Sequence, residues 1–438
     1  MQAYAKAIRA SDTVRRIGKV VRLSGLAIEA VGPDCAVGDV CELLSKRSGL
    51  RLKAEVVALQ QGRVVLMPYG ELAGIGLDCD VVVSGTTSSL RVGAGLLGRV
   101  IDAFGQPLDG RPLPPLAEAR ALKGEPLNPL GRPPIQQVLE TGVRCIDALL
   151  TVGRGQRMGI FAGSGVGKST LLGMVARNMR ADVNVIGLIG ERGREVREFI
   201  DKSLGPAGLA RSVVVVATSD QPAAVRTRAA YAATTIAEHF RDAGLDVMLT
   251  MDSVTRFAMA RREIGLSVGE PPTARGYTPS VFAELPRLLE RCGTSDSGGS
   301  ITALYTVLVE GDDLNDPIAD ALRSILDGHL VMSRQLANHG HYPAIDVLHS
   351  VSRLLNDLAS PQEQQLARAA VALLSAYEKN HQMIEIGAYR AGSNPQLDRA
   401  MRLVPELNCW LQQETGKPVA RAEALQALTA LLGPEKRK

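Results

Sequence analysis

The chain has 438 residues, of which 45% are hydrophobic and 22% are charged, and its formal net charge at pH 7 is +4. These values exclude a disordered or fibrous chain, and the length predicts two or three domains. The charge is too small to require nucleic acid, and the aromatic residues that single-strand binding proteins use as stacking platforms make up only 3% of the chain. We therefore expect no nucleic acid partner.

The region up to residue 88 contains short runs of valine, leucine and isoleucine, separated by turn-forming glycine, proline, aspartate and serine. Closely spaced short strands of this kind are typical of a small β-barrel. We therefore assign residues 1–88 to an N-terminal β-barrel domain. The proline-rich stretch at residues 112–134 cannot form a regular helix or a central strand, so we interpret it as a connector or a strap.

Apolar strands alternate with helical stretches from about residue 140 onward, in the order RMGIFA, NVIGLIG, SVVVVAT and DVMLTMD. This alternation predicts a doubly wound parallel sheet and therefore an α/β fold. Beyond residue 358 the sequence is rich in leucine, alanine, glutamine and glutamate with helical spacing. We assign residues 89–357 to the α/β domain and residues 358–438 to a helical C-terminal domain.

A phosphate-binding loop (P-loop, Walker A) is predicted at residues 162–170, which read AGSGVGKST between an apolar strand and a helix. Its glycines let successive N–H groups turn inward, and the start of the helix adds a positive dipole. Lys168 is expected to contact the β- and γ-phosphates of ATP, and Ser169 to coordinate Mg²⁺. The residues expected to bind the nucleotide here are Gly163, Ser164, Gly165, Val166, Gly167, Lys168, Ser169 and Thr170.

Two acidic residues stand at the ends of predicted strands, Glu191 after NVIGLIG and Asp252 in DVMLTMD. Because the carboxyl ends of parallel strands meet at one edge of a sheet, we expect both near the P-loop. Asp252 is predicted to orient Mg²⁺, and a helix N-cap is the alternative. Glu191 is predicted to orient or deprotonate the attacking water, with Arg192 as its partner, and an exposed ion pair is the alternative.

The segment GHYPAIDVLHSVSRLL carries Tyr342 and Arg353 near the end of the same domain. An arginine supplied by a neighbouring subunit would stabilise charge on the transferred γ-phosphoryl group. Arg353 is our candidate for this role, and a structural ion pair is the alternative.

The six cysteines are widely scattered and form no CxxC pair, which predicts free thiols. The N-terminus MQAYAK does not resemble an export signal, and no stretch approaches the roughly 18 apolar residues of a membrane-spanning helix. We expect a cytoplasmic protein that can still dock on a membrane assembly.

Five long blocks resemble the signature blocks of type III secretion ATPases, which are related to the catalytic subunits of rotary ATPases. The resemblance extends over nearly the whole chain and implies a RecA-like ATPase domain at residues 89–357, a β-barrel that helps to form a ring, and a C-terminal helical domain. The blocks are ETGVRCIDALLTVGRGQRMGIFAGSGVGKST, MDSVTRFAMARREIGLSVGEPPTARGY, PSVFAELPRLLERCG, SITALYTVLVEGDDLNDPIADALRSILDGHLVMSR and HYPAIDVLHSVSRLLND.

The resemblance also implies a homohexamer with ATP between subunits. It agrees with the roles given above to the P-loop, Glu191 and Asp252, and it favours Arg353 as an arginine finger acting in trans. Tyr342 resembles a residue that packs on adenine, and Tyr389 in IGAYRAG is a second candidate for the same pocket.

The function implied by the resemblance is ATP hydrolysis that energises protein export by releasing chaperones from secretion substrates and unfolding them at the cytoplasmic face of the inner membrane. Stator-type and central-stalk-type proteins, chaperone–effector complexes and the export gate are the implied partners. VLVEGDDLNDP and PPTARGY resemble the injectisome branch more closely than the flagellar branch.

Four alternatives remain open: a flagellar export ATPase, a catalytic subunit of a proton-translocating rotary ATPase, an RNA translocase, and a ring subunit that does not hydrolyse ATP. The rotary subunit is disfavoured because YEKNHQMIEIGAY lacks the acidic cluster of that subunit, and because one chain carries both Glu191 and an intact SVSR. The sparse aromatic residues disfavour the translocase. Intact Lys168, Glu191 and Asp252 disfavour the non-hydrolysing subunit.

Overall fold

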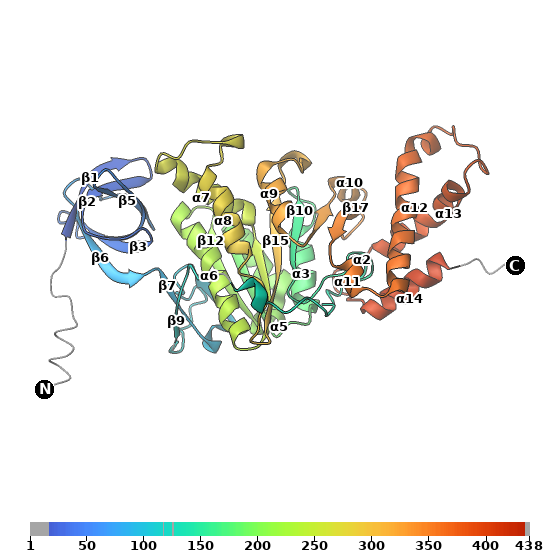
Figure 1. Cartoon of the computed structure of the whole chain (residues 1–438), viewed down its shortest axis with the longest axis horizontal. Coiled ribbons are helices and arrows are strands. Elements are labelled where there is room, and N and C mark those ends of the chain that lie inside the picture. The colour runs from blue at the N-terminus through green and yellow to red at the C-terminus, as the bar shows by residue number, and fades with distance from the viewer. Residues whose placement is uncertain (1–16, 117, 125–126, 434–438) are drawn as a thin grey trace.

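A computed structural model describes residues 17–116, 118–124 and 127–433. Residues 1–16 of the predicted barrel domain and the C-terminal EKRK lie outside the described residues. Figure 1 shows an elongated molecule with a β-barrel at one end, a sheet covered by helices in the middle, and a group of helices at the other end. The α/β class predicted from the alternating strands and helices is confirmed.

The barrel closes on itself in the strand order β1-β2-β5-β4-β3-β6, as the short apolar runs predicted. Its interior is filled by aliphatic side chains such as Ile28, Leu43 and Leu66, which alternate with outward-facing residues along each strand. The strands are β1 (Ile17–Ser24), β2 (Ala27–Val31), β3 (Asp39–Leu44), β4 (Arg51–Gln60), β5 (Arg63–Pro68) and β6 (Asp80–Thr87).

The connector after the barrel begins with a two-stranded sheet formed by β7 (Ser89–Val92) and β9 (Glu118–Ala121). It continues as an irregular strap, in which the Arg132 guanidinium donates to the backbone carbonyls of Glu290 and Cys292. Such side-chain bonds fasten the strap to the central domain, because proline lacks the backbone N–H that a regular β-ladder needs.

The central sheet has the order β17-β16-β10-β15-β13-β11-β12-β8, and its strands are parallel except for the edge strand β17, while the short β14 pairs antiparallel with β15. The parallel register brings the ends of β10, β11 and β13 to one edge of the sheet. The strands are β8 (Arg99–Asp102), β10 (Arg157–Ala162), β11 (Val183–Glu191), β12 (Ser212–Thr218), β13 (Asp246–Asp252), β14 (Gly293–Thr294), β15 (Ser300–Leu308), β16 (Gly328–Met332) and β17 (Ile345–Ser352).

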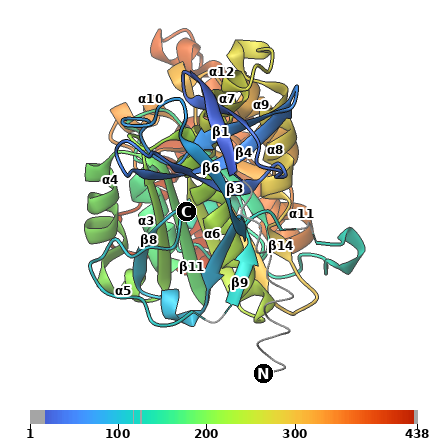
Figure 2. The ribbon, with the colours of Figure 1, turned by 90° about the vertical axis from the view of Figure 1, so that its left-hand side faces the viewer.

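Helices cover both faces of this sheet, as Figure 2 shows from the barrel end. One face bears α3 (Lys168–Asn178), α4 (Gly193–Glu198), a π-helical turn at Phe199–Leu204 and α5 (Gly205–Ala210). The other bears α6 (Ala223–Asp242), α7 (Val254–Ser267), α8 (Pro279–Leu289) and α9 (Pro317–Ile325). The remaining short helices are α2 (Arg144–Leu149), α10 (Arg334–Asn338), α11 (Leu355–Leu358) and 3-10 turns at Ala94–Leu96, Pro129–Gly131, Ala274–Gly276 and Glu310–Asp312.

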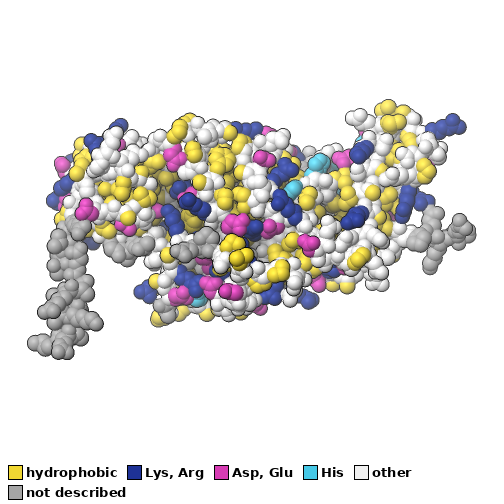
Figure 3. Space-filling view, viewed as in Figure 1, with side chains coloured by type: hydrophobic (Ala, Val, Ile, Leu, Met, Phe, Trp, Pro, Cys, Tyr) yellow, Lys and Arg dark blue, Asp and Glu magenta, His cyan; other side chains and the backbone are white. Residues whose placement is uncertain are grey.

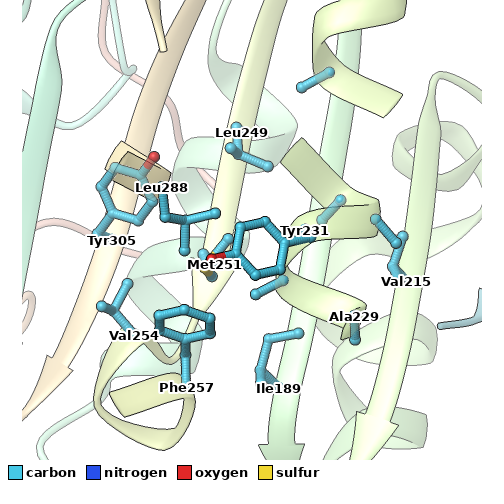
Figure 4. Packing of buried hydrophobic residues seen from close by; sticks show 14 of the residues in the cluster. Ile189, Val215, Ala229, Tyr231, Leu249, Met251, Val254, Phe257, Leu288 and Tyr305 are labelled. Carbon is cyan, nitrogen blue, oxygen red and sulfur yellow. The ribbon is translucent and has the colours of Figure 1, made fainter. Parts of the chain in front are cut away.

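The two faces of the sheet carry separate hydrophobic clusters, because side chains alternate along each strand. On the face of α6 and α7, Tyr231 and Phe257 pack edge to face with ring centroids 5.9 Å apart (Figure 4). An aromatic pair of this kind adds about 0.5–1.5 kcal/mol to what its buried area contributes. The core therefore fixes the start of α7 directly behind the end of β13.

The described part of the C-terminal domain, up to residue 433, contains three helices: α12 (Pro361–Glu385), α13 (Pro395–Leu411) and α14 (Arg421–Leu432). A reciprocal capping box between Ser360 and Glu363 starts α12. Arg144 of α2 donates to the carbonyl of Trp410 at 2.7 Å, which attaches α13 to the central domain. The linker between α13 and α14 therefore runs back toward the central sheet.

On the face seen in Figure 3, basic and acidic side chains are interspersed along the molecule. The six cysteines are present as free thiols, as their spacing predicted. Within residues 17–116, 118–124 and 127–433, no helix has both the length and the apolar character to cross a membrane.

Candidate active site

The P-loop lies between the end of β10 and the start of α3, which begins at Lys168. Gly165 and Gly167 have φ angles of 79° and 93°, in the left-handed region that favours glycine. At Gly167 an added Cβ would also lie 3.4 Å from the ring of Tyr342. The local sequence therefore folds as expected for a turn that presents backbone N–H groups and a helix N-terminus to an anion.

Lys168 lies between two carboxylates at the same edge of the sheet. Its ammonium forms a close ion pair with Asp252, and its Nζ lies 3.5 Å from Oε1 of Glu191. The exposed fractions of these side chains are 12% for Lys168, 10% for Glu191 and 4% for Asp252. Because β11 and β13 are adjacent parallel strands, their ends deliver the two acidic residues together, as the sequence predicted.

Burial and mutual charge set the protonation of this cluster. Burial alone would lower the pKa of Lys168, but the charges of Asp252 and Glu191 outweigh it and raise the pKa above its usual value. Burial raises the pKa of Glu191 to about 7, with a further rise from Asp252 and an opposing effect from Lys168. A carboxylate with a pKa near neutrality suits an acceptor of a proton from water.

Thr306 fixes one oxygen of Asp252, because its hydroxyl donates to Oδ1 at 2.7 Å. Arg256, at the start of α7, packs against Gly190, and its charge lowers the pKa of Glu191 against the effect of burial. Neither residue was predicted from the sequence. Thr306 follows from the same rule that located Glu191 and Asp252, since it stands near the carboxyl end of a parallel strand.

The residues present fit a magnesium–nucleotide complex. The buried cluster of one ammonium and two carboxylates has a surplus of negative charge, and Oε1 of Glu191 is buried without a hydrogen-bond partner among the described residues. Within the same described ranges, no group of three or more His, Cys, Asp or Glu side chains is arranged to hold a metal by itself. Mg²⁺ is commonly bound by one or two protein oxygens together with substrate phosphates.

A pocket of about 1110 Å³ opens beside the P-loop. Its walls include Gly165, Thr170 and Tyr342 on one side and the linker between α13 and α14 on the other. The backbone carbonyl of Tyr342 accepts a hydrogen bond from the N–H of Gln413 at 2.9 Å, so the backbone at Tyr342 and the linker are held together. The pocket is large enough for a nucleotide, and the aromatic ring provides a flat surface for a base.

Two residues that were predicted to act in the site of their own chain are not brought to this cluster. Arg192 does not pair with Glu191 but is 78% exposed and lies 3.8 Å from a carboxylate oxygen of Glu195. Tyr389 lies between α12 and α13, where its hydroxyl donates to Asp398 at 3.0 Å, and it does not line the pocket beside the P-loop. Arg192 points away because its backbone is the extended N-cap of α4, one residue beyond the buried strand.

Arg353 is exposed and lies near the amino-terminal ends of the parallel strands, whereas the P-loop of its own chain lies at their carboxyl-terminal ends. The register pairs Ser352 with Gly328 and Gly328 with Met158, at the beginning of β10. Roughly 13 Å of strand separates that end of β10 from the P-loop. The Arg353 guanidinium donates to the carbonyl of Arg323 at 3.0 Å and makes no described contact with the P-loop.

Residues 142–352 match the nucleotide-binding domain of the ATP synthase alpha/beta family, and residues 359–430 match the T3SS EscN ATPase C-terminal domain. The combination joins a rotary-type nucleotide domain to a C-terminal domain of type III secretion ATPases. The chain belongs to the type III export ATPase family. The resemblance and the RecA-like core inferred from the sequence are thereby confirmed.

Relatives from flagellar and secretion systems match this export ATPase over almost its whole length. The flagellum-specific ATP synthase of Bacillus subtilis (strain 168) is 54% identical over 435 residues, which cover 99% of each chain. The type 3 secretion system ATPase of Xanthomonas euvesicatoria is 49% identical over 417 residues, covering 95% of this chain and 94% of the relative.

A solved structure of the assembled ATPase EscN from the enteropathogenic E. coli type III secretion system has the same fold. It superposes with a TM-score of 0.91 at 44% identity and covers 95% of this chain and 100% of that chain. The expected ATPase activity follows from membership of this family.

Proposed function

We propose that this export ATPase hydrolyses ATP at sites shared between subunits of a homohexamer. The observation that carries the proposal is the placement of Lys168 and Arg353 at opposite ends of the parallel strands of one sheet. A single chain therefore has the phosphate loop but cannot bring its own arginine to the γ-phosphate. A ring of identical chains supplies each loop with the arginine of a neighbour.

Within one chain we assign the roles by position. Lys168 contacts the β- and γ-phosphates, while Ser169 and Asp252 hold Mg²⁺, which when bound neutralises developing charge on the phosphate oxygens. Glu191 orients the attacking water and accepts its proton, because its elevated pKa lies near neutrality. Arg192 is left out of this proposal, since its side chain points to solvent.

The pocket beside the P-loop is the proposed site of the adenine base. Tyr342 stacks on the base, and the linker at residues 412–419 closes the pocket from the side of the C-terminal domain. Tyr389 is not part of this site. We also propose domain boundaries after residues 88 and 357, which place the barrel in a separate ring-forming domain.

We further propose that hydrolysis energises type III protein export at the cytoplasmic face of the inner membrane, by release of chaperones and unfolding of substrates. One solved relative is EscN in complex with its central stalk EscO, and it covers 95% of this chain with a TM-score of 0.86. By analogy this chain has a stalk-type partner. Stator-type proteins, chaperone–effector complexes and the export gate are the remaining partners of the proposal.

The test combines two measurements on the same samples. ATPase rate is measured across a dilution series, and light scattering coupled to size exclusion gives the mass of each species. Activity that appears together with a sixfold assembly supports the shared site. Full activity in a dilute monomer would overturn it.

A flagellar export system is the second candidate, because one relative, the flagellum-specific ATP synthase of Bacillus subtilis, is 54% identical. The resemblance of VLVEGDDLNDP and PPTARGY favours the injectisome. Complementation separates the two, because the chain would restore motility in a strain that lacks its flagellar ATPase or secretion in a strain that lacks its injectisome ATPase. Restored secretion without motility supports the injectisome, and the reverse result supports the flagellum.

A further inference from the structure

Arg334, the first residue of α10, forms a bridge between the P-loop and a separate loop at residues 310–316. Its Nε donates to Oδ2 of Asp312 at 3.0 Å, and its Nη1 donates to the backbone carbonyl of Ser164 at 3.2 Å. One guanidinium therefore binds a carboxylate on one loop and the phosphate-binding loop on the other. Arginine is suited to this because its donors point in fixed directions.

The contact with Ser164 fixes the direction of a neighbouring N–H. In a planar trans peptide the carbonyl oxygen and the N–H point in opposite directions. A guanidinium that holds the Ser164 carbonyl outward therefore turns the N–H of Gly165 toward the interior of the loop, where phosphate oxygens bind.

Gly163 shows how closely this bridge packs on the P-loop. A Cβ added there would lie 2.4 Å from Oδ1 of Asp312 and 2.7 Å from Nη2 of Arg334. Both neighbours occupy the space of a side chain, so a larger residue at this position would push the bridge away from the P-loop. The lack of a side chain at the first glycine of the loop therefore allows close contact with a second loop, in addition to a wide range of backbone conformations.

Ion pairs also connect the loop at residues 310–316 with the loop that carries Arg275. The Arg275 guanidinium donates to Asp313 at 2.6 Å and to Asp316 at 3.1 Å. Arg275 and Asp312 have φ angles of 50° and 57°, which are uncommon for residues other than glycine. Asp313, which pairs with Arg275, and Asp312, which pairs with Arg334, are adjacent in the chain, so one loop joins two ion pairs, the second of which ends on the P-loop.

We propose that Arg334 is a positioning residue that holds the P-loop in its phosphate-binding shape, and that Asp312 sets the orientation of Arg334. The proposal rests on the nucleotide site proposed above. Arg334 and Asp312 are 46% and 44% exposed, and exposed ion pairs contribute little to global stability. Their loss should therefore weaken nucleotide binding without unfolding the protein.

Kinetics and nucleotide binding of the assembled protein test the proposal. We expect Arg334→Ala to raise the KM for ATP and the Kd of a fluorescent ADP analogue by about tenfold, with kcat within about threefold of wild type. Asp312→Ala should act in the same direction with a smaller effect. The double variant should not exceed Arg334→Ala, because both changes remove one bridge.

Two further variants separate positioning from general effects. Arg334→Lys keeps the charge but lacks the planar guanidinium whose Nε and Nη1 reach Asp312 and Ser164 separately, so it should lose affinity nearly as Arg334→Ala does. The matched control is Arg120→Ala, since Arg120 pairs with Glu118 and Asp242 away from the P-loop. It should leave KM unchanged.

Two results would overturn the proposal: an unchanged Kd in Arg334→Ala, with or without a lowered Tm, or additive effects in the double variant. Lys168→Ala distinguishes failure of the bridge from failure of the site. If Lys168→Ala is inactive and Arg334→Ala behaves as wild type, only the bridge is wrong. If Lys168→Ala hydrolyses ATP normally, the site and the bridge are both wrong.

Discussion

The Nζ of Lys168 lies 3.5 Å from Oε1 of Glu191, and this oxygen is buried with no hydrogen-bond partner among the described residues. Lys168 attracts this carboxylate by charge, while its closer ion pair is with Asp252. An oxygen without a hydrogen-bond partner can accept a hydrogen bond from a water molecule. Because burying it unpaired lowers the free energy of unfolding, changes at this residue should alter both hydrolysis and stability.

Glu191→Gln should retain nucleotide binding and lose hydrolysis by about a hundredfold or more, because the amide cannot accept a proton. Equilibrium binding of a fluorescent ADP analogue and single-turnover hydrolysis measure the two effects separately. The isosteric change keeps the packing of the strand end. Equal losses of binding and turnover would contradict the assigned role.

The stability of the nucleotide-free protein should depend on Glu191 in a defined pH window. Burial raises the pKa of this carboxyl from 4.5 to about 7, so the folded state binds the proton more tightly than the unfolded state. Its contribution therefore favours folding below this window and is lost as pH rises from about 4.5 to about 7. The difference in Tm between Glu191→Gln and wild type should therefore shift in favour of the variant as pH rises through this range, and it should keep its higher value above the range. Thermal unfolding at a series of pH values measures this difference.

Lys168→Ala should abolish hydrolysis and lower the free energy of unfolding by roughly 3–5 kcal/mol, because it leaves two buried carboxylates without their cation. A second change tests the cause. Lys168→Ala combined with Glu191→Gln should regain part of the lost stability, since one negative charge is removed. Denaturant unfolding of the four proteins in this cycle measures the coupling, and strictly additive effects would rule it out.

Arg353→Ala should keep nucleotide affinity and lose turnover by about a thousandfold, as expected for an arginine that acts only on the transition state. Mixed rings of Arg353→Ala and Lys168→Ala subunits should regain activity, because some interfaces join an intact P-loop to an intact arginine. Each variant mixed with itself is the control. Stable mixed rings without activity would exclude action in trans.

Tyr342→Ala should weaken binding of ADP by about 1–3 kcal/mol, which is the range measured for stacking of a base on an aromatic ring. Tyr342→Phe keeps the stacking surface and should bind nearly as wild type. Tyr389→Ala is the matched control, because its hydroxyl is engaged by Asp398 outside the pocket. Isothermal titration with ADP measures all three.

Sequence patterns predicted the elements on which this site is built. The parallel β11 and β13 and the glycine-rich turn after β10 have strong local signals, so the meeting of Lys168, Glu191 and Asp252 at one edge was foreseeable. The closed barrel followed equally well from its short apolar runs.

Side-chain direction and long-range pairing could not be predicted in the same way. Arg192 was expected beside Glu191 because the two are adjacent in sequence, but neighbouring residues at a strand end point in different directions. The bridge from Arg334 to Asp312 and Ser164 joins three segments that are far apart in the chain, and no periodicity in the sequence encodes it.

The nucleotide pocket has walls from two domains, since the linker between α13 and α14 faces the P-loop across it. The helices α12, α13 and α14 are attached through that linker and through α2, at the end of the molecule farthest from the barrel (Figure 1). A ligand that fills this pocket would therefore touch the central sheet and the linker to the C-terminal helices at the same time.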